Sequence, residues 1–404
     1  MQRLDDVYLA SRLVRQGEPF NVNTLQERFQ LLLANPLFAR LNARLLPEDG
    51  LGRAVLDIDV TRARPWQLGL FANNHLAPAV GSAVGGLDGS ISNITGWGDT
   101  LSATLYGSNG TVSHDASWAL PLFGRSTVAT LRLARTHASV IEEPVDRLDI
   151  KSLVGVREFG ISQPVIDSAR QRLALALTHS LRHNATSFLD GEPFAVVPGS
   201  DPSGTTRLES WRLSQDYTLR IDRHVLALRA SYVRGRNNLA PAPDQPLVPP
   251  TRYGLWQAQA QAALALGDGD TQLLLRGQLQ RSPQHLLPLE QMAIGGRHTV
   301  RGYRENTLVR DNAWAASAEV HWPLWRNDDQ RASVKLVPFV DAGAAWNRDE
   351  DHRRLASAGL GLVLAWADFE GELFYGRRLE RRPTDTRGDL QDHGIHIALR
   401  YRPF

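Results

Sequence analysis

The sequence predicts an all-β membrane protein, a 16-stranded antiparallel transmembrane β-barrel preceded by a small α+β module. Three observations predict it: repeated segments with a two-residue periodicity, connections of alternating length, and the lack of any run of about 18 apolar residues. A transmembrane barrel places its apolar residues at every second position, so its overall hydropathy stays low. A barrel is therefore compatible with a chain that has no helical membrane span.

The alternation is clearest in the segment HGIHIALRYRP, where Ile395, Ile397, Leu399 and Tyr401 alternate with polar or small residues. One apolar and one polar face fits a strand between lipid and a watery lumen. Sixteen such segments, an even number as in bacterial barrels, begin near residues 65, 82, 100, 111, 126, 150, 171, 206, 224, 250, 271, 313, 332, 354, 369 and 393.

The connections between these segments alternate in length. Those after even-numbered segments are short, such as LFGR and IDR, whereas those after odd-numbered segments reach GRNNLAPAPDQPLVPP. Outer-membrane barrels have short periplasmic turns and longer surface loops. A large soluble all-β protein, the structural alternative, has no reason to separate its loops in this way. The pattern predicts a bacterial outer-membrane location for residues 64–404.

The first 63 residues differ from the rest and predict a separate periplasmic module. The segment NVNTLQERFQLLLANP predicts a helix with Asn23 or Thr24 as its N-cap and Pro36 after its end. Its apolar residues at helical spacing are Leu25, Phe29, Leu32 and Leu33. A β-hairpin follows in the segment FARLNARLLPEDGLGRAVLDIDVTRAR, up to Arg64. Two strands are few for an independent unit, so residues 1–20 are expected to supply the remainder.

Composition and motifs exclude several classes of function. The chain has 45 Lys+Arg against 43 Asp+Glu and no basic run, so we expect no nucleic-acid partner. Zero cysteines exclude disulfides and thiolate metal sites. Nucleotide-binding, nucleophile-elbow and H-E-x-x-H motifs are absent, so we expect no ATP, cofactor, metal or enzymatic activity. A lipase or protease of the outer membrane is the enzyme to exclude.

The longest connection lies between the eleventh and twelfth segments and contains MAIGGRHTVRGYRENTLVRDN, with four arginines. Its part IGGRHTVRGYREN resembles the signature loop of the haemolysin secretion/activation family, the outer-membrane transporters of two-partner secretion. The resemblance implies that loop 285–312 folds into the lumen. It also implies that Arg301 pairs there with acidic groups of the inner wall. The loop motif itself comprises Val300, Arg301, Gly302 and Tyr303.

The two-residue periodicity gives an independent test of that pairing. Even-numbered residues of the twelfth segment face outward, which turns Glu319 toward the lumen. In the thirteenth segment the same rule turns Phe339 and Asp341 inward. A buried Arg301 needs such carboxylates, because an unpaired guanidinium costs several kcal/mol; the alternative is a solvated surface arginine. We expect Gly302 to take a positive φ and Tyr303 to pack on the wall with its hydroxyl bonded.

The resemblance covers nearly the whole chain. RPWQLGLFANN and GSISNITGWGDTLSATLYGS resemble the family's first three strands, and SAE and FVD resemble later strand motifs. The N-terminal module, residues 1–63, resembles the last part of a polypeptide-transport-associated (POTRA) domain and is expected to be incomplete. The segment MQRLDDVYLASRLVRQ lacks an apolar secretory signal, so we expect a mature or truncated start.

The function implied is an outer-membrane pore that secretes a partner exoprotein, of adhesin or haemolysin type, to the cell surface without ATP. The unfolded partner would dock on the module helix at Leu25, Phe29, Leu32 and Leu33, or add a strand to the module sheet. Outer-membrane lipids and the barrel-assembly machinery, which recognises an aromatic end such as Phe404, are the other expected partners. An assembly factor of the same superfamily and a passive porin are the alternatives.

Overall fold

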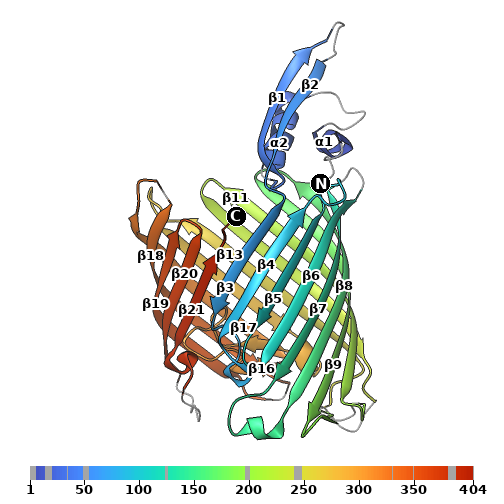
Figure 1. Cartoon of the computed structure of the whole chain (residues 1–404), viewed down its shortest axis with the longest axis vertical. Helices are drawn as coiled ribbons and strands as arrows, with labels where there is room; N and C mark the ends of the chain where they lie inside the picture. Colours follow the sequence, from blue (N-terminus) through green and yellow to red (C-terminus); the bar gives the residue numbers. More distant parts are fainter. Residues whose placement is uncertain are drawn as a thin grey trace.

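The computed structural model is a closed antiparallel β-barrel with a helix-and-hairpin module at one end (Figure 1). The C-terminal Phe404, residues 1–5 and residues 14–20, to which predictions were attached, lie outside the part of the chain that the structure describes. That part comprises residues 6–13, 21–33, 35–48, 54–122, 126–195, 201–240, 248–329, 331–348, 350–380 and 388–403.

Sixteen strands form the barrel wall, and each begins within two residues of its predicted start. A two-residue strand, β10 (Glu192–Pro193), adds to the surface end of β9. The wall strands are β3 (Trp66–Asn73), β4 (Val84–Ser92), β5 (Thr100–Gly107), β6 (Thr111–Leu122), β7 (Thr127–Ser139), β8 (Lys151–Asp167), β9 (Gln171–Phe188), β11 (Thr205–Ile221), β12 (His224–Asn237), β13 (Arg252–Ala265), β14 (Gln272–Arg281), β17 (Asn312–Arg326), β18 (Ala332–Trp346), β19 (Arg353–Trp366), β20 (Phe369–Arg378) and β21 (Ile395–Tyr401).

The strands alternate between a lipid-facing and a lumen-facing side, as their periodicity predicted. In β9, for example, Leu175, Leu177 and Leu181 share one parity and are exposed on the outside, while Ser180 between them is buried. An apolar outer face is what a barrel presents to lipid. Within the described ranges, no helix is both long and apolar enough to cross a membrane.

The barrel closes where the last strand meets the first. Strand β21 pairs with β3 over four positions, from Ala398 opposite Asn73 to Tyr401 opposite Leu70. Beyond the last pair, the side chain of Asn74 extends the seam, because it donates to the carbonyl of Ile395 and accepts from the amide of Ile397. The backbone amide of Asn74 also donates to the carbonyl of Ile397 at 3.2 Å, so backbone and side chain together extend the surface end of this seam.

The N-terminal module consists of α1 (Asp6–Leu13), α2 (Val22–Leu33), β1 (Phe38–Pro47) and β2 (Ala54–Arg62). The predicted helix and hairpin are confirmed, but the predicted N-cap is wrong. Asn21 caps α2, because its side-chain oxygen accepts from the amides of Asn23 and Thr24. An N-cap side chain bonds to the second or third amide after it, so the cap lies two residues before Asn23.

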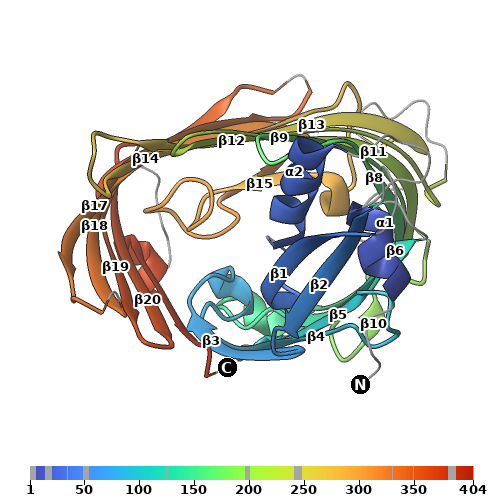
Figure 2. The same cartoon turned by 90° about the horizontal axis from the view of Figure 1, so that it is seen from above.

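The module has its own small core, to which α1 contributes a helix rather than a further strand. Tyr8 and Leu13 of α1 pack with Leu32 of α2 and with Phe38 and Leu41 of β1. Seen along the barrel, the module lies over the periplasmic opening (Figure 2). Gly98, in the first periplasmic turn, lies against Tyr8 and Leu37, and a β-carbon there would meet the Tyr8 ring at 2.5 Å.

Candidate functional site in the barrel lumen

The sixth surface loop, residues 282–311, folds back into the lumen instead of extending into solvent (Figure 2). It contains a 3-10 turn, η3 (Pro288–Glu290), and a short hairpin of β15 (Met292–Ile294) with β16 (Leu308–Arg310). The hairpin holds the segment 295–307 at its far end. The predicted inward fold of loop 285–312 therefore agrees with the observed position of these residues.

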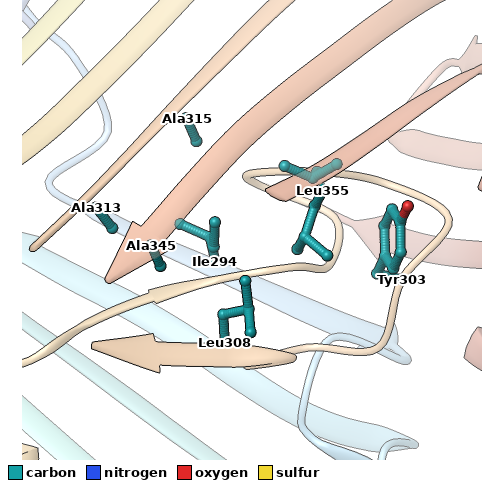
Figure 3. Packing of buried hydrophobic residues seen from close by; sticks show 8 residues of the cluster. Ile294, Tyr303, Leu308, Ala313, Ala315, Ala345 and Leu355 are labelled. Carbon is teal, nitrogen blue, oxygen red and sulfur yellow. The ribbon is translucent and has the colours of Figure 1, made fainter. Parts of the chain in front are cut away.

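Apolar contacts seat the loop hairpin against the inner wall. Figure 3 shows that the wall offers mainly small residues at this place, which lets the hairpin approach closely. The loop contributes Ile294, Val300, Tyr303 and Leu308, and the wall contributes Ala313, Ala315, Ala345 and Leu355. A β-carbon on Gly343 would lie 3.2 Å from both Ile294 and Val300, so the wall has little room for a larger side chain.

Arg301 lies at the centre of what we call the tip site, made of Arg301, Ser317, Glu319 and Asp341. The residue is 1% exposed. Nε donates to Oδ2 of Asp341 and Nη2 to Oδ1, both at 2.7 Å, which is a bidentate pair. Nη1 donates to Glu319 at 2.6 Å, and Nη2 also donates to Ser317 at 2.8 Å. The backbone amide of Arg301 adds a third bond to Asp341, at 3.0 Å.

The face of the guanidinium is covered as well as its edge. The ring of Phe339 lies 3.6 Å from the central carbon of the Arg301 guanidinium, at cation–π distance. Burial alone would lower the pKa of Arg301, but the hydrogen bonds and charges of Asp341 and Glu319 outweigh it and raise the pKa. A charge-neutralising site of this kind keeps the arginine ionised in a place that water does not reach.

The two residues after Arg301 behave as their sequence predicted. Gly302 has φ +89°, and a β-carbon on it would lie 2.6 Å from the carbonyl oxygen of Gly376, so both conformation and space require glycine. Tyr303 is buried, and its hydroxyl lies 3.0 Å from the carbonyl oxygen of Ala356 and 2.9 Å from that of Glu380. The whole motif, Val300 included, is enclosed between loop and wall.

The other loop arginines also find carboxylates, which the sequence had not indicated. Arg297 pairs with Glu372 of β20 at 2.6 Å. Arg304 bridges two further surface loops, because it pairs with Glu142 at 2.7 Å and with Asp392 at 2.5 Å. Glu319 additionally accepts from Arg276 and His321. Of these residues, Arg276 was within reach of sequence reasoning, since it lies on the polar side of the eleventh segment.

The loop is anchored a second time near its start, at a place we call the root site, made of Arg182, Arg212 and Glu290. Glu290 in η3 is 5% exposed and pairs with Arg182 of β9 at 3.1 Å. Burial raises the pKa of Glu290, and the charges of Arg182 and Arg212 oppose that rise. Beside it, the buried Asp311 accepts from the amide of Leu286 at 2.9 Å, which ties the two ends of the loop together.

The predicted docking residues of the module are in a different situation. Leu32 is buried in the module core, and Leu25 and Phe29 pack against that core. Only Leu33, 45% exposed, presents its side chain to solvent. Helical spacing correctly found the apolar face of α2, but that face is occupied by the module's own α1 and hairpin. Among the described residues, no group of His, Asp and Glu could hold a metal ion.

Fold and site together define an outer-membrane β-barrel whose sixth loop is anchored inside its own lumen. The family model for the haemolysin secretion/activation protein ShlB/FhaC/HecB matches residues 52–364. The chain therefore belongs to the haemolysin secretion/activation family. This is a family of outer-membrane transporters and not of enzymes.

Individual relatives agree with this membership. The outer membrane transporter CdiB of Dickeya dadantii (strain 3937) is 27% identical over 167 residues, which are 40% of this chain and 29% of that protein. CdiB from Escherichia coli has a similar structure, with a TM-score of 0.80 at 18% identity over 98% of this chain and 74% of the other. CdiB from Acinetobacter baumannii gives 0.75 at 17% identity, over 99% and 72%.

Proposed function

We propose that this chain secretes a partner exoprotein from the periplasm to the cell surface through the barrel lumen. The observation that carries the proposal is the tip site, where a loop arginine with 1% exposure is held by two carboxylates of the wall. A passive porin has no need to hold a loop in its lumen by a fully buried ion pair. A transporter needs a lumen that is closed at rest and opens when its substrate arrives.

The path of the exoprotein follows from the position of the loop. The hairpin of β15 and β16 lies inside the ring of strands (Figure 2), and in this proposal an extended chain passes when the loop leaves the wall. The chain then folds outside the cell. Folding removes the way back, which supplies direction without nucleotide hydrolysis.

Residues 1–63 serve in this proposal as a POTRA-like periplasmic module that captures the exoprotein. Strands β1 and β2 form a two-stranded sheet, so within the described residues each has an edge without a neighbouring strand. Such an edge accepts an extended peptide by backbone hydrogen bonding. Strand addition is favoured over the helix groove, because Leu25, Phe29 and Leu32 are occupied in the module core.

The test is secretion by an Arg301→Ala variant co-expressed with an exoprotein encoded beside it. We expect the variant to insert into the outer membrane and to lose most of the exoprotein in the medium. Arg229→Ala, which removes a lumen arginine paired with Asp216 away from the loop, is the matched control. Normal secretion by Arg301→Ala, with its barrel correctly inserted, would remove the basis of the proposal.

A further inference from the structure

The outer face of the barrel carries a group of arginines that the transport function does not use. We call this group the arginine belt. It lies on β7, β8 and β11 to β13, and its members, all exposed, are Arg135, Arg157, Arg207, Arg234, Arg236 and Arg252. Their parity shows that they face outward: Arg157 shares its side of β8 with Phe159 and Ile161, which are 51% and 42% exposed.

The belt lies directly on the surface side of a row of aromatic residues. Strand β8 begins at the third surface loop, so Arg157 is nearer the cell surface than Phe159. On β12, Tyr232 is the next outward residue on the periplasmic side of Arg234. On β13, Trp256 is the second outward residue on the periplasmic side of Arg252. The ring centres of Tyr232 and Trp256 are 4.7 Å apart. Aromatic girdles mark the membrane–water interfaces of barrels. The belt is therefore at the height of the lipid headgroups of the outer leaflet.

The belt holds more positive charge than the protein neutralises. The register places Arg236 directly opposite Arg252 on the same face, and like charges at such positions are destabilising. Arg236 is relieved by Glu209, at 2.6 Å. For Arg135, Arg157, Arg234 and Arg252, the described part of the chain provides no carboxylate partner. An anionic ligand would remove this repulsion.

The opposite side of the barrel shows that the belt is not a general feature of the wall. Strands β3 to β6 contain no arginine or lysine at all. Their outward positions are apolar or small, as with the exposed Leu70, Leu87, Leu105 and Val112, except for His114 of β6. Six outward arginines lie on β7, β8 and β11 to β13, against two, Arg354 and Arg377, on β19 and β20.

We propose that the arginine belt binds a phosphate-bearing lipid of the outer leaflet. The guanidinium groups suit phosphate, because their planar fork forms bidentate hydrogen bonds with its oxygens. The acyl chains would lie along the apolar surface below, formed by Trp211, Leu213, Tyr232 and Trp256. This surface is what favours a lipid over an acidic polypeptide, which would need no apolar row beneath the charges.

The experiment measures binding of lipid A, a bis-phosphorylated glycolipid, to the purified full chain in non-ionic detergent by native mass spectrometry. Arg234→Gln/Arg252→Gln removes two belt charges. Its control, Arg354→Gln/Arg377→Gln, removes two exposed outward arginines of β19 and β20 on the other side of the barrel. Since a charged hydrogen bond contributes about 1.5–3 kcal/mol, we expect about tenfold weaker binding or more for the belt variant and less than about twofold for the control.

Three further ligands test whether the belt recognises a phosphorylated lipid, free phosphate or an acidic polypeptide. Dephosphorylated lipid A should bind as weakly to the native chain as lipid A does to the belt variant. Inorganic phosphate and a polyglutamate peptide should not compete with lipid A at equal phosphate or carboxylate concentration. Equal weakening in both variants, full binding of the dephosphorylated lipid, or displacement by phosphate or polyglutamate would each overturn the proposal. If the belt variant does not fold, Arg135→Gln/Arg157→Gln takes its place with the same expected result.

Discussion

The two ends of the sixth loop are held by opposite charges. At the tip site the loop brings a cation, Arg301, to a wall that supplies Glu319 and Asp341. At the root site it brings an anion, Glu290, to a wall that supplies Arg182 and Arg212. The wall thus offers carboxylates to the loop at the tip site and guanidinium groups at the root site. A loop with these charges has one favourable orientation across the lumen and one unfavourable one.

The two sites also differ in how completely their polar groups are paired. At the tip, Nε, Nη1 and Nη2 of Arg301 all donate, and Phe339 covers the guanidinium face. At the root, Nε of Arg182 is buried without a hydrogen-bond partner. A buried pair stabilises only when its remaining hydrogen bonds are satisfied. The tip is therefore the stronger anchor, and the root is the end where the loop can loosen first.

The largest effect is expected from Asp341→Ala. It leaves the buried Arg301 with Glu319 and the hydroxyl of Ser317 as its remaining partners at the tip site, and breaking a buried pair costs about 3–5 kcal/mol. The measurement is the free energy of unfolding of the barrel in detergent, followed by loss of heat-modifiable mobility in denaturant. Asp115→Ala is the control, since its partner Arg132 is 41% exposed and such pairs contribute about 0–1 kcal/mol. Equal losses in both variants would contradict the buried anchor.

Gly302→Ala is expected to have the next largest effect. Holding a residue with a side chain in this left-handed conformation lowers the free energy of unfolding by about 1–3 kcal/mol. The new methyl group would also clash with the carbonyl oxygen of Gly376. We expect trypsin to cleave after the loop arginines in this variant and not in the native protein. Gly277→Ala on β14 is the control, because a β-carbon there has nothing within 4 Å. Protection of the loop in Gly302→Ala would show that the tip tolerates a shifted backbone.

Glu290→Gln tests the weaker anchor. The substitution removes one charged hydrogen bond. It also removes the cost of burying a carboxylate, the same cost that raises the pKa of Glu290. We therefore expect the free energy of unfolding to fall by less than about 1.5 kcal/mol. The same unfolding measurement applies. A loss as large as that of Asp341→Ala would reverse the ranking of the two ends.

The smallest effect is a pH dependence at the tip. Burial raises the pKa of Glu305 from 4.5 to about 7, while the amide and charge of Arg297 oppose the rise. A carboxyl whose pKa is raised by folding adds to the stability of the folded loop. This added stability is complete below the ordinary pKa of 4.5 and is lost as the pH rises from there through about 7. Hydrogen exchange at residues 296–299, corrected for intrinsic rates, should be slower at pH 5.5 than at pH 8. Glu305→Gln should remove the difference; an unchanged difference would assign it to another group.

Much of this architecture was predictable because alternation and loop length are local properties of a barrel sequence. They located the sixteen strands and turned Glu319 and Asp341 inward, and the family resemblance supplied Arg301 as their partner. Alternation gives the side of the wall but not the height along it. The contacts of Arg297 with Glu372 and of Arg304 with Glu142 and Asp392 join elements whose stagger no local pattern fixes.

The sequence placed the N-cap of α2 at the wrong residue and did not show that the docking residues are covered, for two different reasons. Asn21, Asn23 and Thr24 are all good N-cap residues, so the choice among them depended on where the backbone first turns helical. The apolar face of α2 was recognised correctly, but a periodic pattern does not say what covers it. Here α1, whose Tyr8 and Leu13 enter the same core, covers part of it.

At rest the loop is held against the wall, and in the proposed function it must leave the wall for secretion. The most direct measurement is a cross-link in this cysteine-free chain, with Ile294→Cys on the loop and Ala345→Cys on the wall, two residues of one buried cluster (Figure 3). We predict a spontaneous disulfide that stops secretion and a reductant that restores it. A disulfide that forms while secretion continues unchanged, or two thiols that never join in an inserted barrel, would contradict the account.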